Sequence, residues 1–238
     1  MKELFTAFGL YNLRARLSVG IILIAPWLLE LYLFVPEIQK LTSTIIILLI
    51  IYGFCNLLII YCRIPGTRAM KKCFPDLLPA QKALLPSSNY IDQKSKERYY
   101  TFLSQNIDEF IISNDDAHMK ECVSTAVTWL IAQTRDSEKF QLIAEENINF
   151  GFSYNLLGLK PLGLTMCSIG TIFNGALFFL NYKQFISLNL IDIVCGFIIN
   201  LTFLLIWVFI INKNLVVSSG KKYARALLSA CDSLSSEQ

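Results

Sequence analysis

Two apolar stretches near the C-terminus decide the fold: PLGLTMCSIGTIFNGALFFL at residues 161–180 and IDIVCGFIINLTFLLIWVFII at residues 191–211. Each has about 20 mainly apolar residues, the length with which an α-helix crosses the hydrocarbon core of a bilayer. Two further stretches, residues 17–35 and 41–62, meet the same criterion. The sequence therefore predicts an all-α integral membrane protein with four transmembrane helices arranged in two hairpins.

The composition supports this class. The 238 residues are 54% hydrophobic and 16% charged, which is more apolar than an ordinary soluble domain. The seven cysteines occur singly, and the chain has one histidine. We therefore expect neither a disulfide framework nor a zinc site, and no cofactor.

The first apolar stretch, residues 17–35, has an alternative interpretation as a signal peptide, because Lys2, Arg14 and Arg16 precede it. It is too long for the apolar part of a signal peptide, and no small-x-small cleavage site occurs before Pro36. We expect it to be a retained transmembrane span.

Lys and Arg near the span ends predict the orientation, because basic flanks stay on the cytoplasmic side. They concentrate before the first span, after the second and after the fourth, whereas residues 36–40 and 181–190 hold one basic residue each. Both termini are therefore predicted to be cytoplasmic. The basic residues concerned are Lys2, Arg14, Arg16, Arg63, Arg68, Lys71, Lys72, Lys213, Lys221, Lys222 and Arg225.

This orientation divides the chain into four parts. The predicted parts are 1–62 with the first hairpin, 63–160 as a cytoplasmic helical domain with a stalk, 161–212 as the second hairpin, and 213–238 as an amphipathic cytoplasmic tail. The tail helix, over 216–234, can lie on the membrane or pack on the cytoplasmic helices.

The segment from Arg63 to Asp92 holds four of the seven prolines, which predicts an irregular collar at the membrane surface. Asp92 is the expected N-cap of the helix that follows. A second helix is expected from Ser113, with a capping box closed by Asp116 and an apolar face. The residues of that face are Met119, Cys122, Val123, Ala126, Val127, Leu130 and Ile131.

A third helix is expected to start near Asp136 or Ser137 and to run through Pro161 into the third span. Such a stalk can transmit motion from a cytoplasmic domain to a transmembrane helix. The alternative is a continuous helix that only connects two packed regions.

No catalytic motif is present. The chain lacks the Walker, GxGxxG, GxSxG and HExxH patterns, and we do not expect an enzyme. His118 lies in the first turn of a solvated helix and is predicted to be an ordinary surface or interface histidine.

Polar residues inside the predicted spans carry more information, because each is costly in hydrocarbon and usually faces protein or water. Two rows follow helical spacing, one through Ser168, Thr171 and Asn174 or Gly175 and one through Asp192, Gly196 and Asn200. They can line a pore, or they can hydrogen-bond one helix to another. The candidates for pore lining are Glu30, Asn56, Thr171, Asn174, Asp192 and Asn200.

We do not expect one chain with four spans to enclose a pore by itself. A channel would need a closed ring of copies, and we expect a homo-oligomer, a tetramer.

Three runs resemble a group of small bacterial membrane proteins from anti-phage systems, in which a nucleotidyltransferase supplies a nucleotide signal to a membrane effector. They are RIPGTRAMKKCFPDLLP at 63–79, IDQKSKERYYTFL at 91–103 and TRDSEKFQLIAEENINFGFSYNLLGLKPLG at 134–163. With its two predicted hairpins, the chain is most similar to the Hailong-type effectors. The resemblance implies an oligomeric ion channel in the bacterial inner membrane that binds an oligonucleotide on its cytoplasmic side. Its opening would depolarise the infected cell, as in abortive infection.

Phosphate contacts need Lys or Arg. The nucleotide-binding candidates are Arg63, Arg68, Lys71, Lys72, Lys94, Lys96 and Arg98. Beside them Tyr99, Tyr100 and Phe102 can offer stacking faces or belong to a core. Membrane topology alone explains the first four basic residues.

Two other functions stay open. One is a membrane-anchored adaptor that recruits a protein partner through its cytoplasmic helices, without conductance. The other is a lipid-modifying enzyme, for which the sequence offers no catalytic residues.

Overall fold

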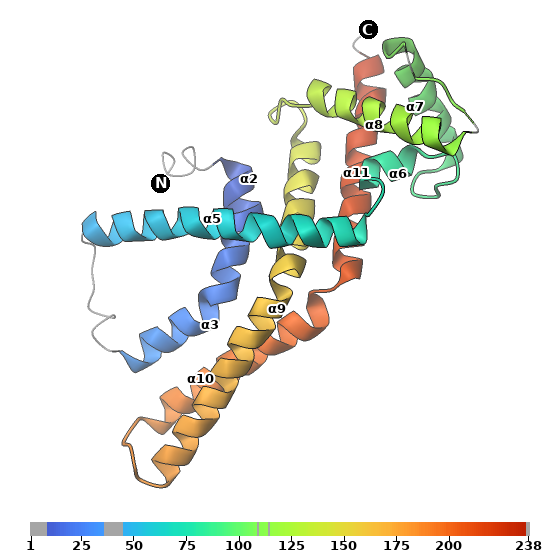
Figure 1. Ribbon diagram of the computed structural model, residues 1–238. Helices are drawn as coiled ribbons and strands as arrows, with labels where there is room; N and C mark the ends of the chain where they lie inside the picture. The colour runs from blue at the N-terminus through green and yellow to red at the C-terminus, as the bar shows by residue number, and fades with distance from the viewer. Residues whose placement is uncertain (1–8, 36–44, 109, 114, 237–238) are drawn as a thin grey trace. The chain divides into compact units, whose positions relative to one another are not determined.

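The computed structural model describes residues 9–35, 45–108, 110–113 and 115–236. Over these residues the regular structure is entirely helical, as the sequence predicts (Figure 1). The chain divides into two compact units. The apolar unit comprises Met1–Ala69 and Gly151–Asn212, and the polar unit comprises Met70–Phe150 and Lys213–Gln238.

Within the described residues, three helical stretches are long and apolar enough to cross a membrane, namely Leu10–Phe34, Gln141–Tyr182 and Leu190–Ile210. They cover the first, third and fourth predicted spans, except for the last residue of the first span, Val35, and of the fourth, Ile211. The second predicted span, 41–62, begins outside the described residues and continues in the helix α5, Ile45–Cys73. The elements of the first three stretches are α2 (Leu10–Asn12), the π-helical turn η1 (Leu13–Leu17), α3 (Ser18–Phe34), α9 (Gln141–Tyr182), α10 (Leu190–Leu205) and the π-helical turn η2 (Ile206–Ile210).

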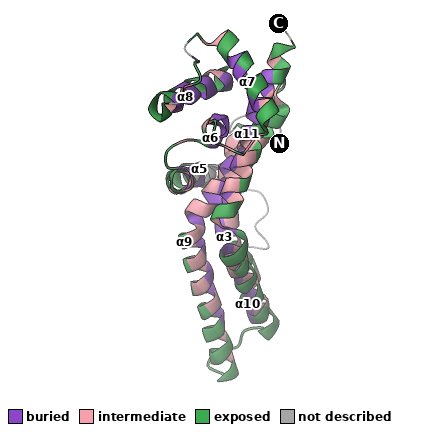
Figure 2. Cartoon of the chain, turned by 90° about the vertical axis from the view of Figure 1, so that its right-hand side faces the viewer, coloured by how far each residue is buried: buried purple, intermediate pink, exposed green. Residues whose placement is uncertain are grey.

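The helix α10 returns alongside α9, as expected for the second hairpin, whereas α5 crosses α3 and α9 (Figure 1). Figure 2 gives the same result, because α5 is seen almost end-on there while α3, α9 and α10 run lengthwise. The structure therefore does not confirm a first hairpin in which two spans run side by side.

Glycines allow the crossing helices to approach closely. A Cβ at Gly158 of α9 would overlap the backbone of Pro65 and Gly66 in α5, and a Cβ at Gly20 of α3 would lie 3.0 Å from the Cβ of Leu58. Small residues at such points let helix backbones pack closely within a membrane.

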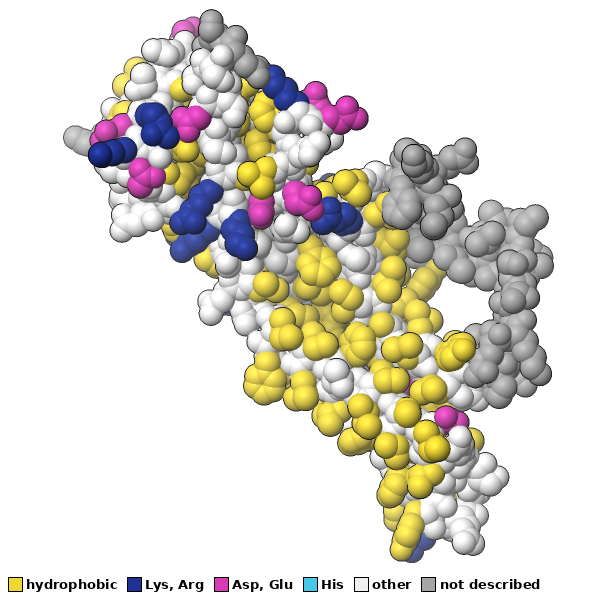
Figure 3. All heavy atoms as spheres, turned by 180° about the vertical axis from the view of Figure 1, so that it is seen from behind, with side chains coloured by type: hydrophobic (Ala, Val, Ile, Leu, Met, Phe, Trp, Pro, Cys, Tyr) yellow, Lys and Arg dark blue, Asp and Glu magenta, His cyan; other side chains and the backbone are white. Residues whose placement is uncertain are grey.

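The outer surface of the apolar unit is hydrophobic. Ile172 is 73% exposed, Ile191 68% and Phe209 70%. Figure 2 shows exposed residues along α9 and α10, and Figure 3 shows a dense field of hydrophobic side chains. A surface of this kind is stable only when lipid or another apolar partner covers it, so the exposed residues support a membrane protein.

The predicted irregular collar is partly wrong. The helix α5 continues through Pro65 to Cys73, and Pro79–Leu84 forms the short helix α6. A proline removes one helical hydrogen bond, and a helix packed against neighbours on both sides of that turn tolerates the loss. Pro79 occupies the first turn of α6, where its missing N–H has no intrahelical partner to lose.

The polar unit is a helical bundle around its own core. It contains α6, α7 (Gln93–Asn106), α8 (Asp116–Gln133), the first turns of α9 and α11 (Lys213–Ser235). The tail helix α11 packs on α6 and α7. Of the two alternatives for the tail, packing on helices or lying on the membrane, the structure shows the first. Fully buried core residues include Leu84, Leu103, Val123, Leu130, Leu227 and Leu228.

The helix starts are confirmed in part. Asp92 caps α7 and accepts a hydrogen bond from the Ser95 N–H at 2.9 Å, as predicted. The capping box at Ser113 is wrong, because Asp115 is the N-cap of α8 and accepts from the Ala117 N–H at 3.2 Å. Ser113 Oγ accepts instead from the Asp115 N–H, before the helix begins.

The expected apolar face of α8 is buried except for Ile131, which is 40% exposed. The third helix starts at Gln141, later than expected, because Asp136 Oδ1 accepts from the N–H groups of Glu138 and Lys139 in a preceding turn. From there α9 is unbroken through Pro161 to Tyr182.

Candidate functional site

The strongest polar feature of the apolar unit joins three helices at one carboxylate. Glu30 of α3 is 4% exposed and accepts hydrogen bonds from the side-chain amides of Asn174 in α9 and Asn200 in α10. Both asparagines are fully buried. We call these three residues the Glu30 cluster. The structure thus brings together half of the six residues predicted to line a pore.

The two asparagines sit in matching surroundings. Each Nδ2 also donates to the carbonyl of the glycine four residues earlier in its own helix, Asn174 to Gly170 at 2.9 Å and Asn200 to Gly196 at 3.1 Å. A Cβ at Gly170 would overlap the Asn200 amide, and a Cβ at Gly196 would lie 2.6 Å from Asn174 Oδ1. Each glycine therefore makes room for the asparagine of the other helix.

The sequence contains a signal for this arrangement that our prediction used only in part. Gly196 and Asn200 were placed in one row, and Gly170 and Asn174 have the same G-x-x-x-N spacing in the third predicted span. Spacing by four residues puts both members on one helix face. Two such faces in antiparallel contact place each glycine opposite an asparagine.

The amide oxygens of Asn174 and Asn200 are buried and have no hydrogen-bond partner in the described part of the structure. Both face a glycine of the opposite helix, where Cα–H groups can act as weak donors to oxygen. Within one chain, this geometry is that of a contact between helices.

A cavity of about 300 Å³ lies beside Glu30. Aromatic and aliphatic side chains form the rest of its wall, and its lining residues are Trp27, Glu30, Leu31, Phe34, Val35, Phe173, Leu177 and Leu188.

The other three pore candidates contribute no hydrogen bond to the Glu30 cluster. Thr171 donates to the Cys167 carbonyl of its own helix at 2.8 Å. Asp192 is half-buried in the first turn of α10, where the helix dipole favours an acid, and Asn56 is half-buried on α5.

Lys96, predicted to contact nucleotide, is 1% exposed in the polar unit. Its Nζ donates to the carbonyls of Leu85 at 3.0 Å, Pro86 at 3.3 Å and Ser88 at 2.6 Å. Burial lowers the pKa of this amine. All three donors of the ammonium group are used within the fold, so Lys96 anchors the segment that precedes α7.

The remaining basic candidates are exposed. Arg63 and Arg68 belong to the apolar unit, and Lys71, Lys72 and Lys94 to the polar unit. Arg98 also belongs to the polar unit, where it forms an ion pair with Asp232 at 3.1 Å that raises the arginine pKa.

The aromatic candidates lie in the core of the polar unit. Tyr99, Tyr100 and Phe102 are each at most 7% exposed, and burial raises the pKa of Tyr100 to about 12. The Tyr100 hydroxyl donates to the Leu84 carbonyl. None of the three presents an open face on which a base can stack.

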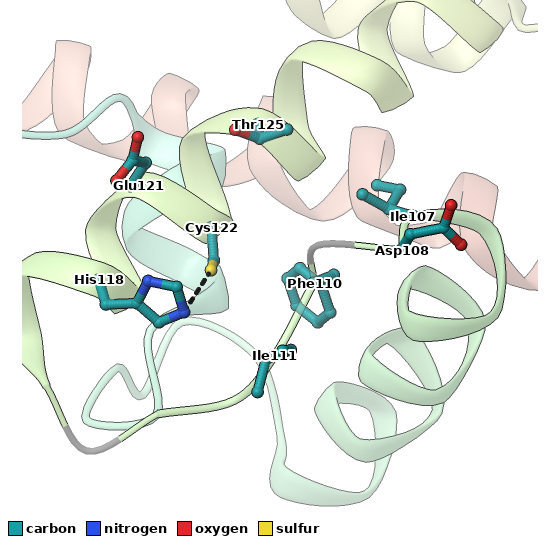
Figure 4. A pocket seen from close by; sticks show the side chains of 8 residues that line it. All are labelled: Ile107, Asp108, Phe110, Ile111, His118, Glu121, Cys122 and Thr125. Carbon is teal, nitrogen blue, oxygen red and sulfur yellow. Dashed lines mark hydrogen bonds between the residues drawn. The ribbon is translucent and has the colours of Figure 1, made fainter.

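A second cavity, of about 380 Å³, lies in the polar unit between α8 and the segment after α7 (Figure 4). His118 Nε2 and Cys122 Sγ share a hydrogen bond of 3.5 Å at its wall. The spacing of these residues by four positions could have signalled their proximity. Asp108 and Glu121 make the wall acidic, which disfavours phosphate; the lining residues are Ile107, Asp108, Phe110, Ile111, His118, Glu121, Cys122 and Thr125.

Comparison with protein-family models, curated proteins and solved structures finds no match. Among the described residues, no group of three or more His, Cys, Asp or Glu side chains is placed to hold a metal ion. The function is therefore argued from the geometry and from the sequence resemblance.

Proposed function

We propose that the chain is an oligomeric membrane effector of bacterial anti-phage defence, an ion channel gated by a nucleotide signal on its cytoplasmic side. The observation that carries the proposal is the continuity of α9, Gln141–Tyr182. Its start belongs to the polar unit and its end to the apolar unit, where it supplies Asn174 to the Glu30 cluster.

Packing holds α9 at two places, one in each unit. Near its start, Phe150 stacks on Tyr223 of α11 with ring centroids 6.0 Å apart and meets the Phe74 ring edge-on at 5.9 Å. Farther along, a Cβ at Gly163 would overlap the indole of Trp207. A helix held at two places along its length can transmit a rotation or a shift, which is a common element of gated proteins.

In this proposal the Glu30 cluster holds the closed state. Opening would separate α3 from α9 and α10 and turn the carboxylate toward a pore formed by several copies, where a ring of acids favours cations. A tetramer of the chain in the bacterial inner membrane is the proposed assembly.

The proposed topology has four spans in two hairpins, with both termini cytoplasmic and residues 41–62 as the second span. It is supported by the apolar outer face of α5, where Leu57 is 65% and Ile60 63% exposed. Alkaline phosphatase inserted within 36–40 or 181–190 should be active, and after Gln238 inactive. Activity at the C-terminus, or inactivity within 36–40, would contradict four spans.

Conductance tests the channel itself. The purified full-length protein in planar bilayers should give discrete currents that change when short oligonucleotides are added on the cytoplasmic side. Glu30→Gln keeps an oxygen that accepts from both asparagines and removes the charge, so we expect reduced preference for cations. Silence from a well-folded oligomer under all these conditions would reject the channel.

The alternative is an adaptor, and the cavity of the polar unit favours it. Ile111 is 61% and Ile112 54% exposed beside the acidic wall, and such a surface suits a protein better than a phosphate. A partner that binds the full chain in fixed ratio and is lost in Ile111→Ser, together with absent conductance, would favour the adaptor.

A further inference from the structure

Glu30 is a buried acid that forms no ion pair with a described cation. Its Oε1 accepts two amide N–H groups, which favour the ionised carboxylate, whereas burial without a counter-charge disfavours it. Among the described residues, no lysine or arginine forms an ion pair with Glu30. An unpaired charge within a membrane is costly, so a cation bound nearby would stabilise it.

The cavity beside Glu30 provides room for such a cation. It measures about 300 Å³, and Glu30 is the one charged residue among the described residues that line it. Leu31 and Phe173 at its wall are each 47% exposed on the apolar outer surface. A ligand can therefore reach Glu30 from the lipid side.

The residues of the cavity wall favour an organic cation over a metal ion. Hard metal ions need several oxygen ligands, and this wall offers a single carboxylate. The amide oxygens of Asn174 and Asn200 face glycines of the neighbouring helices instead. Trp27, Phe34 and Phe173 supply aromatic rings, which attract the weakly hydrated head of an organic ammonium ion.

We propose that this cavity binds a hydrophobic ammonium ion, with its cationic head at the Glu30 carboxylate and its apolar part against Trp27, Phe34 and Phe173. The occupant is a free amine from the membrane, because the ammonium of a phospholipid is tethered to a phosphate at the bilayer surface. The site goes beyond the proposed function, and it holds for a channel and for an adaptor alike.

The test uses the full-length protein in nanodiscs of phosphatidylglycerol, which has no ammonium group. Titration with benzyltriethylammonium should quench tryptophan fluorescence in a saturable way, and Trp27→Phe should remove this signal. Glu30→Gln should weaken binding about tenfold or more, because it removes an ion pair that is shielded from water. Asp192→Asn removes an equal charge from the same unit outside the cavity, and its affinity should match the wild type.

A second variant guards against misfolding. Phe34→Leu changes no charge and should weaken binding several-fold through the lost ring. Equal affinity of the wild type, Glu30→Gln and Phe34→Leu, or no saturable quenching at all, overturns the proposal. Loss of binding when phosphatidylethanolamine is added would also overturn it, because the lipid would then be the occupant. Binding is measured without current, so failure here is distinct from failure of the channel.

Discussion

Substitution of Lys96 by methionine should destabilise the polar unit, because it removes the donor to three carbonyls. Methionine keeps most of the side-chain length and places no charge in the site. An acceptor left buried without a partner costs about 1–3 kcal/mol. Two effects reduce this loss of stability. Water can reach part of the vacated site, because Pro86 and Ser87 are exposed. The substitution also removes the free-energy cost of burying a charged amine. We expect a net loss of about 3 kcal/mol.

Thermal unfolding of the full-length protein gives the measurement. A loss of this size corresponds to a fall of about 10 °C or more for a unit of this length. Lys94→Met is the matched control, since Lys94 lies two residues earlier on α7 and is exposed, and its substitution should change stability by less than about 0.5 kcal/mol. Hydrogen exchange should also accelerate at Ser88, whose N–H donates to the Leu85 carbonyl at 3.0 Å.

The result that would refute this reasoning is a Lys96→Met protein as stable as the Lys94→Met protein, with unchanged exchange at Ser88. If that stable variant also lost its response to oligonucleotides, Lys96 would be a ligand contact, as the sequence alone suggests.

Three further predictions concern packing and protonation. Gly170→Leu should cost about 2 kcal/mol by displacing the Asn200 amide, whereas Gly175→Leu, with open space at its Cβ, should unfold like the wild type. The Ser95 N–H lowers the pKa of Asp92 from 3.8, so Asp92→Ala should be less stable than the wild type at neutral pH, and thermal unfolding should show this difference vanishing as the pH falls through the lowered value. Burial raises the pKa of the Cys231 thiol to about 12, so mass spectrometry should find it unalkylated by iodoacetamide in the native protein at about pH 8 and alkylated in denaturant.

Local patterns predicted the local structure well. The Asp92 cap and most of the apolar face of α8 depend on residues within a few positions of one another, and both are confirmed. The start of α8 was misplaced because Ser113 and Asp115 both offer an oxygen to nearby N–H groups, and spacing alone does not rank them. Pro65 was placed in an irregular segment, because its close contact with Gly158 of α9 cannot be read from the sequence.

For the Glu30 cluster, the sequence predicted the residues but not that they converge. All three residues were singled out because polar groups are costly in hydrocarbon. Their convergence depends on pairs separated by 144 and 170 positions, which spacing along one helix does not reveal. The burial of Lys96 could not be predicted from the sequence. It lies two residues from the exposed Lys94, and only the fold of the segment before α7 buries it.

The position of the Glu30 cluster on α9 links its chemistry to motion. Its hydrogen bonds tie α3 to both helices of the second hairpin, and the glycines that seat the asparagines leave no space for a side chain at the contact. A rotation of α9 would carry Asn174 away from Glu30, and in hydrocarbon no water replaces the lost donor. In the proposed channel, the cluster would favour one arrangement, and a second would become accessible when the carboxylate finds another partner. A cation in the adjoining cavity, or water in a pore, is such a partner, so occupancy at Glu30 and the position of α9 should depend on each other.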